Sequence, residues 1–162
     1  MKKLLVILFL AVPVFAADEM KKLDWWVGEW SGNASIRMGP GEPQQVQQVE
    51  RVQSKLGGRV LLIEGLGKSG DKAVHEALGV VSYDEKTKSY TFDAWTARDG
   101  HADAWITVGD DHTAKWGFDT PTGGKIRYAV KLTEAGEWNE IGEFSRDGTA
   151  WSKFFEMTLK KK

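Results

Sequence analysis

The sequence predicts an all-β protein, a single up-and-down antiparallel barrel of about ten strands with a short N-terminal helix. The first observation behind this prediction is a tight-turn signal that recurs roughly every 8–12 residues from Gly28 onward. The second is that two-residue turns fix hairpin register, and the resulting registers place the large aromatic side chains on one surface. The turns that carry the argument are Gly57-Gly58, Asp99-Gly100, Asp110-Asp111 and Asp147-Gly148. Consecutive strands joined by short connections close most simply into an up-and-down barrel.

The first 16 residues have the pattern of a secretory signal peptide. Lys2-Lys3 precede an apolar run from Leu4 to Val14, and small residues flank a cleavage position after Ala16. The run is too short for an ordinary membrane span, and no Cys follows it that could carry a lipid. We therefore expect residues 17–162 to form one exported domain with no stable membrane anchor, located in the periplasm of a Gram-negative host.

Local patterns justify each element of this domain in turn. Asp18 can cap a short helix that runs to Trp26, and the first strand begins directly after it at Gly28. Gly39-Pro40-Gly41 makes a rigid turn after that strand. Runs rich in β-branched and aromatic residues, bounded by Gly, Pro and Asp, predict strands at 28–37, 44–55, 59–67, 74–83, 89–97, 102–109, 112–118, 125–133, 137–145 and 149–160.

Composition narrows the class of protein. The exported part has the size of one folding unit. The chain contains no Cys, so a hydrophobic core rather than disulfides must hold an exported domain together. The formal net charge is −1 with both signs scattered, which argues against a nucleic-acid partner. Eight Trp residues are the one anomaly, and they suit a packed core and a ligand-stacking surface equally.

The predicted registers gather the aromatic residues on the inner face of the barrel. They set Trp105 opposite Trp116, Tyr128 opposite Gly142, and Leu132 opposite Trp138, and cross-strand neighbours share a face. Residues 125–133 alternate most clearly between apolar and charged side chains. The residues predicted to face inward are Tyr90, Phe92, Ala94, Trp105, Trp116, Phe118, Ile126, Tyr128, Val130, Leu132, Trp138, Phe144, Trp151, Phe155 and Met157.

Several polar residues fall on the same predicted inner face: Glu76, Thr96, Asp103, Thr107, Glu140 and Lys153. A buried carboxylate is costly unless it is paired or solvated, so these positions indicate either a wet pocket or side chains near a barrel mouth. The predicted register places Glu140 diagonal to Lys153. The Gly57-Gly58 turn sets Arg51 opposite Glu64, an ion pair that would fit the inside or the outside of the barrel.

The sequence carries no catalytic or metal-binding signature. Its three histidines are not spaced with each other or with carboxylates as a metal site requires. It has no Gly-x-Ser-x-Gly elbow and no Cys nucleophile. We therefore expect no catalytic residues, no metal and no cofactor.

The segment 23–30, Leu-Asp-Trp-Trp-Val-Gly-Glu-Trp, resembles the entry to the first strand of lipocalin-like (calycin) barrels. Segments 56–61 and 79–90 look like those of exported bacterial lipocalin-like domains of unknown function, relatives of nitrobindin-type ten-stranded barrels. The resemblance implies that Gly28 and Trp30 close the base of the barrel. Nitrobindin-type barrels bind haem through a His late in the chain, and no His follows His112 here, so the resemblance implies no haem.

Three hypotheses for function follow. The first is a periplasmic binding protein that holds a small, partly apolar or aromatic molecule inside the barrel. Its predicted ligand-binding residues are Tyr90, Phe92, Trp105, Trp116 and Tyr128, with Glu140 and Lys153 as polar contacts. The second is a non-enzymatic envelope interaction module with a filled core. The third is an enzyme that uses Asp103 or Glu140 as a base. An open seam between the first and last strands would in addition favour a homodimer.

Overall fold

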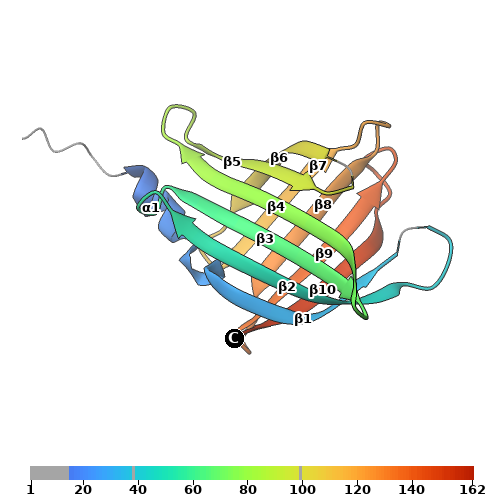
Figure 1. The fold of residues 1–162 in the computed structure, drawn as a ribbon. Helices are drawn as coiled ribbons and strands as arrows, with labels where there is room; N and C mark the ends of the chain where they lie inside the picture. The colour runs from blue at the N-terminus through green and yellow to red at the C-terminus, as the bar shows by residue number, and fades with distance from the viewer. Residues whose placement is uncertain (1–14, 38, 99) are drawn as a thin grey trace, which may run out of the picture.

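The computed structural model describes residues 15–37, 39–98 and 100–162, and its strands close into a ten-strand antiparallel barrel (Figure 1). A short helix, α1 (Phe15–Lys21), and a 3-10 turn, η1 (Asp24–Trp26), precede the first strand. The strands are β1 (Gly28–Ile36), β2 (Gln44–Lys55), β3 (Val60–Ser69), β4 (Lys72–Asp84), β5 (Ser89–Thr96), β6 (Gly100–Val108), β7 (Thr113–Asp119), β8 (Lys125–Leu132), β9 (Glu137–Ser145) and β10 (Ser152–Lys161).

This architecture confirms the predicted fold class. Each strand pairs with its neighbours in the chain, and β1 pairs with β10 over seven residue positions to complete the ring. The seam between the first and last strands is therefore closed, so it offers no free strand edge through which two copies could pair. The bounds of β2 and β9 agree with those predicted, and the predicted N-terminal helix is divided into α1 and η1.

Most of the predicted signal peptide, residues 1–14, lies outside the described residues, as does Asp99 of one predicted turn. Within the described ranges, no helix has the length and apolar character needed to cross a bilayer.

Helix α1 and turn η1 close one end of the barrel, which we call the helix end (Figure 1). Leu23 and Trp26 are buried there, and the Trp26 ring packs edge-on against Trp138 at 5.1 Å between centroids. The indole N–H of Trp30 donates to the Trp26 carbonyl oxygen over 2.8 Å. The Tyr90 hydroxyl on β5 donates to the carbonyl oxygen of Glu19. These contacts make the helix end a packed aromatic core.

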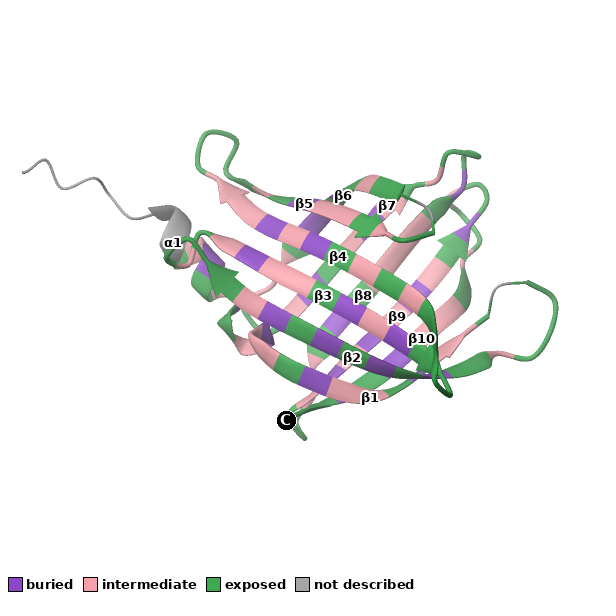
Figure 2. Ribbon diagram, in the orientation of Figure 1, coloured by how far each residue is buried: buried purple, intermediate pink, exposed green. Residues whose placement is uncertain are grey.

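The opposite end, which we call the far end, is formed by the turns β1–β2, β3–β4, β5–β6, β7–β8 and β9–β10. Buried and exposed positions alternate along the strands, as a closed barrel with an inner and an outer face requires (Figure 2). Toward the far end, however, several inward-facing residues keep intermediate exposure, among them Ala94, Ala102, Trp116, Phe118 and Tyr128. In a closed barrel this exposure arises through the lumen.

Strand β6 is turned over relative to its predicted face. The loop before it joins Thr96 to Gly100, and the loop after it is a three-residue Asp110–His112 turn with His112 in the left-handed region at φ 58°. Each loop shifts the register by an odd number of residues, and a one-residue slip moves every side chain to the other face. Trp105 therefore lies on the outside, 49% exposed, instead of lining the interior, and Ile106 takes the inner position.

The start of strand β10 also differs from the prediction. The Asp147-Gly148 segment is part of a six-residue loop in which the Asp147 carboxylate accepts from the backbone N–H groups of Thr149 and Ala150. A bulge between Lys153 and Phe155 then shifts the register again. Lys153 consequently faces outward and pairs with Glu156 at 2.6 Å, so its predicted inward position is wrong.

Candidate functional site

One wall of the lumen beyond the packed Trp layer is aromatic. Trp116 on β7 stacks on Tyr128 of β8 with centroids 4.0 Å apart and ring planes 11° from parallel. Phe92 packs edge-on against Trp116 at 4.9 Å, and Phe155 packs edge-on against Tyr128 at 5.9 Å. A Cβ at Gly142 would lie 2.6 Å from the Tyr128 ring, so the glycine is what allows this ring to lie flat along the wall.

The facing wall is built from small residues. Besides His75 and Thr96, which also face inward there, seven of the inward positions on β3 to β6 toward the far end are Gly or Ala: Gly65, Gly67, Ala77, Gly79, Ala94, Ala102 and Ala104. Phe92, Gln48 and Glu50 fill the space above three of these glycines, since an added Cβ would approach their side-chain atoms to 2.7–2.8 Å. The barrel therefore has stacked rings on one side and, on the other, a wall of Gly and Ala partly covered by Phe92, Gln48 and Glu50, an arrangement that suits a flat, apolar occupant beside the rings.

A polar cluster lies inside the barrel between these walls. Gln48 and Glu50 on β2 face inward and are buried, and the Gln48 amide N–H donates to Glu50 Oε1 over 2.7 Å. Glu140 on β9 is also buried, and its two oxygens accept from the indole N–H groups of Trp116 at 3.2 Å and Trp138 at 3.1 Å. The cluster thus joins two carboxyl groups and one amide in a largely apolar setting.

Burial controls the protonation of this cluster. Loss of hydration raises the pKa of Glu50 to about 8, although the hydrogen bond from Gln48 opposes the shift and the nearby Glu140 adds to it. Loss of hydration likewise raises the pKa of Glu140 to about 7, against the two indole hydrogen bonds that favour its ionised form. At neutral pH these two carboxyl groups are therefore partly protonated, whereas two exposed carboxyl groups would both be ionised.

The structure brings together most of the predicted ligand-binding residues. Phe92, Trp116, Tyr128 and Glu140 face the lumen as expected. Tyr90 also faces inward but belongs to the helix end, where burial raises the pKa of its hydroxyl to about 12. Trp105 and Lys153 are on the outer surface and cannot contact a molecule in the lumen.

Of the remaining polar residues that were predicted to face inward, only Thr96 does so. The turned-over strand β6 places Asp103 and Thr107 outside, and Glu76 lies on the outer face of β4. The enzymatic hypothesis consequently loses Asp103 as a base inside the barrel.

Gln48 and Glu50 are functional candidates that the sequence reasoning missed. Strand β2 reads Gln-Gln-Val-Gln-Gln-Val-Glu-Arg-Val, in which neither face is clearly apolar. The sequence feature that could have indicated that they face inward lies on the next strand, where Gly65 and Gly67 stand opposite Glu50 and Gln48. Two glycines at alternate positions of a strand indicate a surface that other side chains must approach closely. His75, opposite Gly67, is a further inward-facing residue that was not expected on this face.

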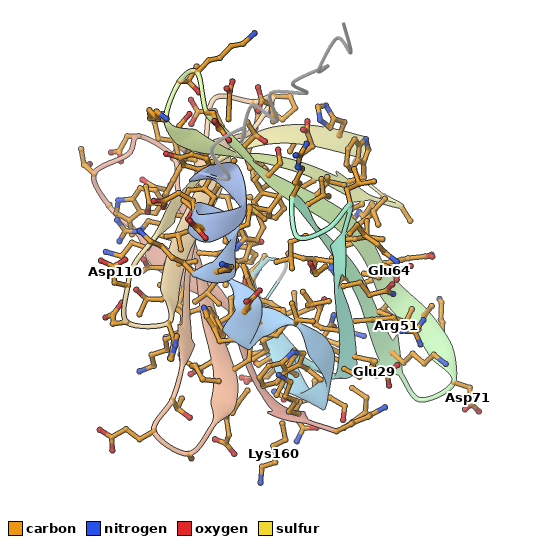
Figure 3. All side chains as sticks on the ribbon, turned by 90° about the vertical axis from the view of Figure 1, so that its left-hand side faces the viewer. Glu29, Arg51, Glu64, Asp71, Asp110 and Lys160 are labelled. Carbon is orange, nitrogen blue, oxygen red and sulfur yellow. The ribbon has the colours of Figure 1, made fainter. Side chains whose placement is uncertain are left out.

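Arg51 and Glu64 are opposite each other, as predicted, and lie on the outer face of the barrel. Arg51 pairs with Glu29 at 3.2 Å, and all three side chains project from the outside of β1 to β3 (Figure 3). They border a shallow groove of about 690 Å³ that crosses β1 to β5. Its apolar floor includes Val49, Leu78 and Trp95, each more than a third exposed.

No group of three His, Asp or Glu side chains suited to a metal ion occurs within residues 15–37, 39–98 and 100–162.

These features define the class of protein: a ten-strand up-and-down barrel closed by a helix at one end and lined by opposed aromatic and small-residue walls toward the other. The chain belongs to the family described as "Protein of unknown function (DUF1579)", which it matches over residues 16–161. It is also similar to the crystal structure of Rv2717c from M. tuberculosis, with a TM-score of 0.64 and 12% identity over 88% of this chain and 96% of that one. At that identity the likeness concerns the fold alone. A search of curated proteins found no significant match.

Proposed function

We propose that the protein is a non-enzymatic binding protein that holds a small, partly apolar molecule in the lumen toward the far end. The observation that carries this proposal is the partial exposure of Trp116 and Tyr128, which face the inside of a closed barrel. Stacked rings that stay accessible to solvent are a costly use of apolar surface unless something covers them. The apolar N-terminal run supports a location in the periplasm.

The placement of the carboxyl groups favours binding over catalysis. Glu140 accepts one indole N–H on each oxygen, which fixes the carboxyl group in place and leaves one lone pair on each oxygen for a donor on a bound molecule. Asp103 lies on the outer face of β6. The interior therefore offers a shaped apolar surface with hydrogen-bond acceptors, and binding is the function that this combination serves best.

Filling the lumen tests the proposal. We expect Ala102→Trp to weaken binding of the neutral fluorescent probe N-phenyl-1-naphthylamine by about 10-fold or more, because the new ring would project into the lumen toward the far end beside Ala94. The matched control is Ala129→Trp, which adds the same ring on the exposed outer face of β8 and should leave binding unchanged. Probe fluorescence gives the affinities. Equal binding by both variants, or no binding by the unmodified protein, would contradict the proposal.

The outer groove favours a second role, contact with another copy of this chain. Val49, Leu78 and Trp95 form its apolar floor, and its borders carry both signs of charge, with Arg51 and Lys162 near Glu29, Glu64 and Glu76. In a two-fold contact the same patch meets itself, so a border of mixed charge can pair opposite signs across the axis.

We expect the unmodified protein to form dimers and Leu78→Lys to be monomeric, because a charge in the floor of the groove would be buried without a partner. Trp105→Lys, on the outer face of β6 and away from the groove, is the matched control and should keep the dimer. Light scattering coupled to size-exclusion chromatography measures the mass. A monomeric unmodified protein would rule this role out.

A further inference from the structure

The interior cluster contains a hydrogen-bond acceptor that nothing in the described chain satisfies. Gln48 is 2% exposed, and its Oε1 has no hydrogen-bond partner, although its amide N–H donates to Glu50. Buried polar atoms without partners are rare in folded proteins because each costs roughly 1–3 kcal/mol. An acceptor of this kind inside a lumen indicates that a donor arrives from outside the chain.

The surroundings of Gln48 are rich in acceptors and carry negative charge. Glu50 bonds to Gln48, Glu140 is close enough to raise the pKa of Glu50, and His75 on β4 stands beside Gln48 across Gly67. No Lys or Arg is found at the inward-facing positions of the described strands toward the far end. Lys161, over the Trp30 ring, belongs to the helix end. Among the inward-facing positions of the described strands toward the far end, the basic side chain beside the cluster is therefore His75, opposite Gly67.

Glycines maintain this arrangement. A Cβ at Gly65 would lie 2.7 Å from Glu50 Oε1, and a Cβ at Gly67 would lie 2.7 Å from Gln48 Oε1. Larger residues there would displace both side chains from the wall. The sequence thus keeps two polar side chains in place at a cost in burial, and the Gln48 Oε1 atom has no hydrogen-bond donor in the described chain.

We propose that the lumen selects molecules that carry a protonated amine on an aromatic or other apolar body, with the ammonium group bound by Gln48, Glu50 and Glu140 and the body stacked against Trp116 and Tyr128. This inference rests on the proposed binding function and specifies its ligand class. An ammonium group has only donors, which matches the unpaired Gln48 Oε1 and the oxygens of Glu50 and Glu140 in their ionised form. Aromatic rings beside it add a cation–π contribution.

Three compounds with a common phenyl body separate the ligand classes: 2-phenylethylamine, 2-phenylethanol and 3-phenylpropionate. Each competes with N-phenyl-1-naphthylamine for the unmodified protein at pH 8.5, where both carboxyl groups are largely ionised. We expect the amine to bind about 10-fold or more tightly than the alcohol, and the carboxylate to bind most weakly. Calorimetry at pH 7 in buffers of different ionisation enthalpy should show that the amine, but not the alcohol, releases protons on binding.

A variant assigns the effect to the cluster. Glu50→Gln should weaken amine binding about 10-fold while leaving the alcohol nearly unchanged. The matched control Glu64→Gln, on the outer face of β3, should alter neither. If Glu50→Gln does not fold, proton release by the unmodified protein still decides the question.

Equal or tighter binding of the alcohol or the carboxylate, or amine binding without proton release, would overturn the inference and leave the proposed function standing. The same holds if the naphthylamine probe binds but none of the three compounds displaces it. If the probe itself does not bind, the proposed function fails first.

Discussion

The free energy of unfolding should fall by roughly 6 kcal/mol as pH rises from 5 to 8.5, because two buried carboxyl groups must lose their protons in the folded protein. Glu50 has a pKa of about 8 and Glu140 one of about 7, against 4.5 for an unperturbed Glu. Between these limits the folded chain binds more protons than the unfolded chain, so stability declines with rising pH. The lowered pKa values of Asp84 and Asp111 act only in acid, below their ordinary value of 3.8.

Urea unfolding followed by Trp fluorescence at several pH values measures this slope. The double variant Glu50→Gln, Glu140→Gln should remove most of it, since amides do not titrate. Glu64→Gln, which changes an exposed carboxyl on the outside of β3, should retain it. A stability that stays level or rises over this range would show that the two carboxyl groups are hydrated in solution.

Replacing Trp138 by Ala should destabilise the protein by about 4 kcal/mol, the cost expected for removing a large ring from a packed interior. The Trp138 ring is 2% exposed, packs edge-on against Trp26 and Trp30, and donates its N–H to Glu140 Oε2. Its loss would open a cavity at the helix end and also leave a buried carboxyl oxygen without its donor. A shift in the midpoint of thermal unfolding reports the change.

Trp105→Ala is the matched comparison, because it deletes the same side chain from the outer face of β6. That ring is half exposed and rests on Gly117, where a Cβ would lie 2.8 Å from it, so its removal should cost about 1 kcal/mol or less. A larger loss for Trp105 than for Trp138 would place the wrong Trp inside the barrel. Trp138→Phe isolates the hydrogen bond, since it keeps most of the packing and deletes only the N–H.

The fold was predictable because turn spacing and strand patterns agree along the whole chain. The face of the sheet on which each side chain lies was predictable only where the loop length was predicted correctly. Leu132 pairs with Trp138 and Tyr128 with Gly142, as expected, because their loop holds three residues that include Gly136 at φ 73°. The predicted facing of the β6 side chains was wrong because His112, a non-glycine residue, adopts a left-handed conformation that adds one residue to its turn. The shifts on both sides of β6 are odd, so the error does not propagate to β7.

The candidate site was only half predictable for a related reason. The alternation of apolar and charged residues on β8 indicates the aromatic wall. The polar cluster depends instead on β2, where Gln and Val occur on both faces. Nothing local distinguishes Glu50, which is buried, from Glu29, which pairs with Arg51 on the surface. That difference arises from closure of the barrel and from glycines on the neighbouring strand, which are features of the tertiary structure.

Helix α1 makes the helix end of the barrel different from the far end. Phe15 is the first described residue and belongs to the helix that covers the helix end, whereas five hairpin turns surround the far end. Under the proposed export and binding functions, the predicted cleavage after Ala16 would take place at the helix end, and a ligand would enter the lumen at the far end. Removal of the signal peptide would then leave the entrance to the lumen unchanged.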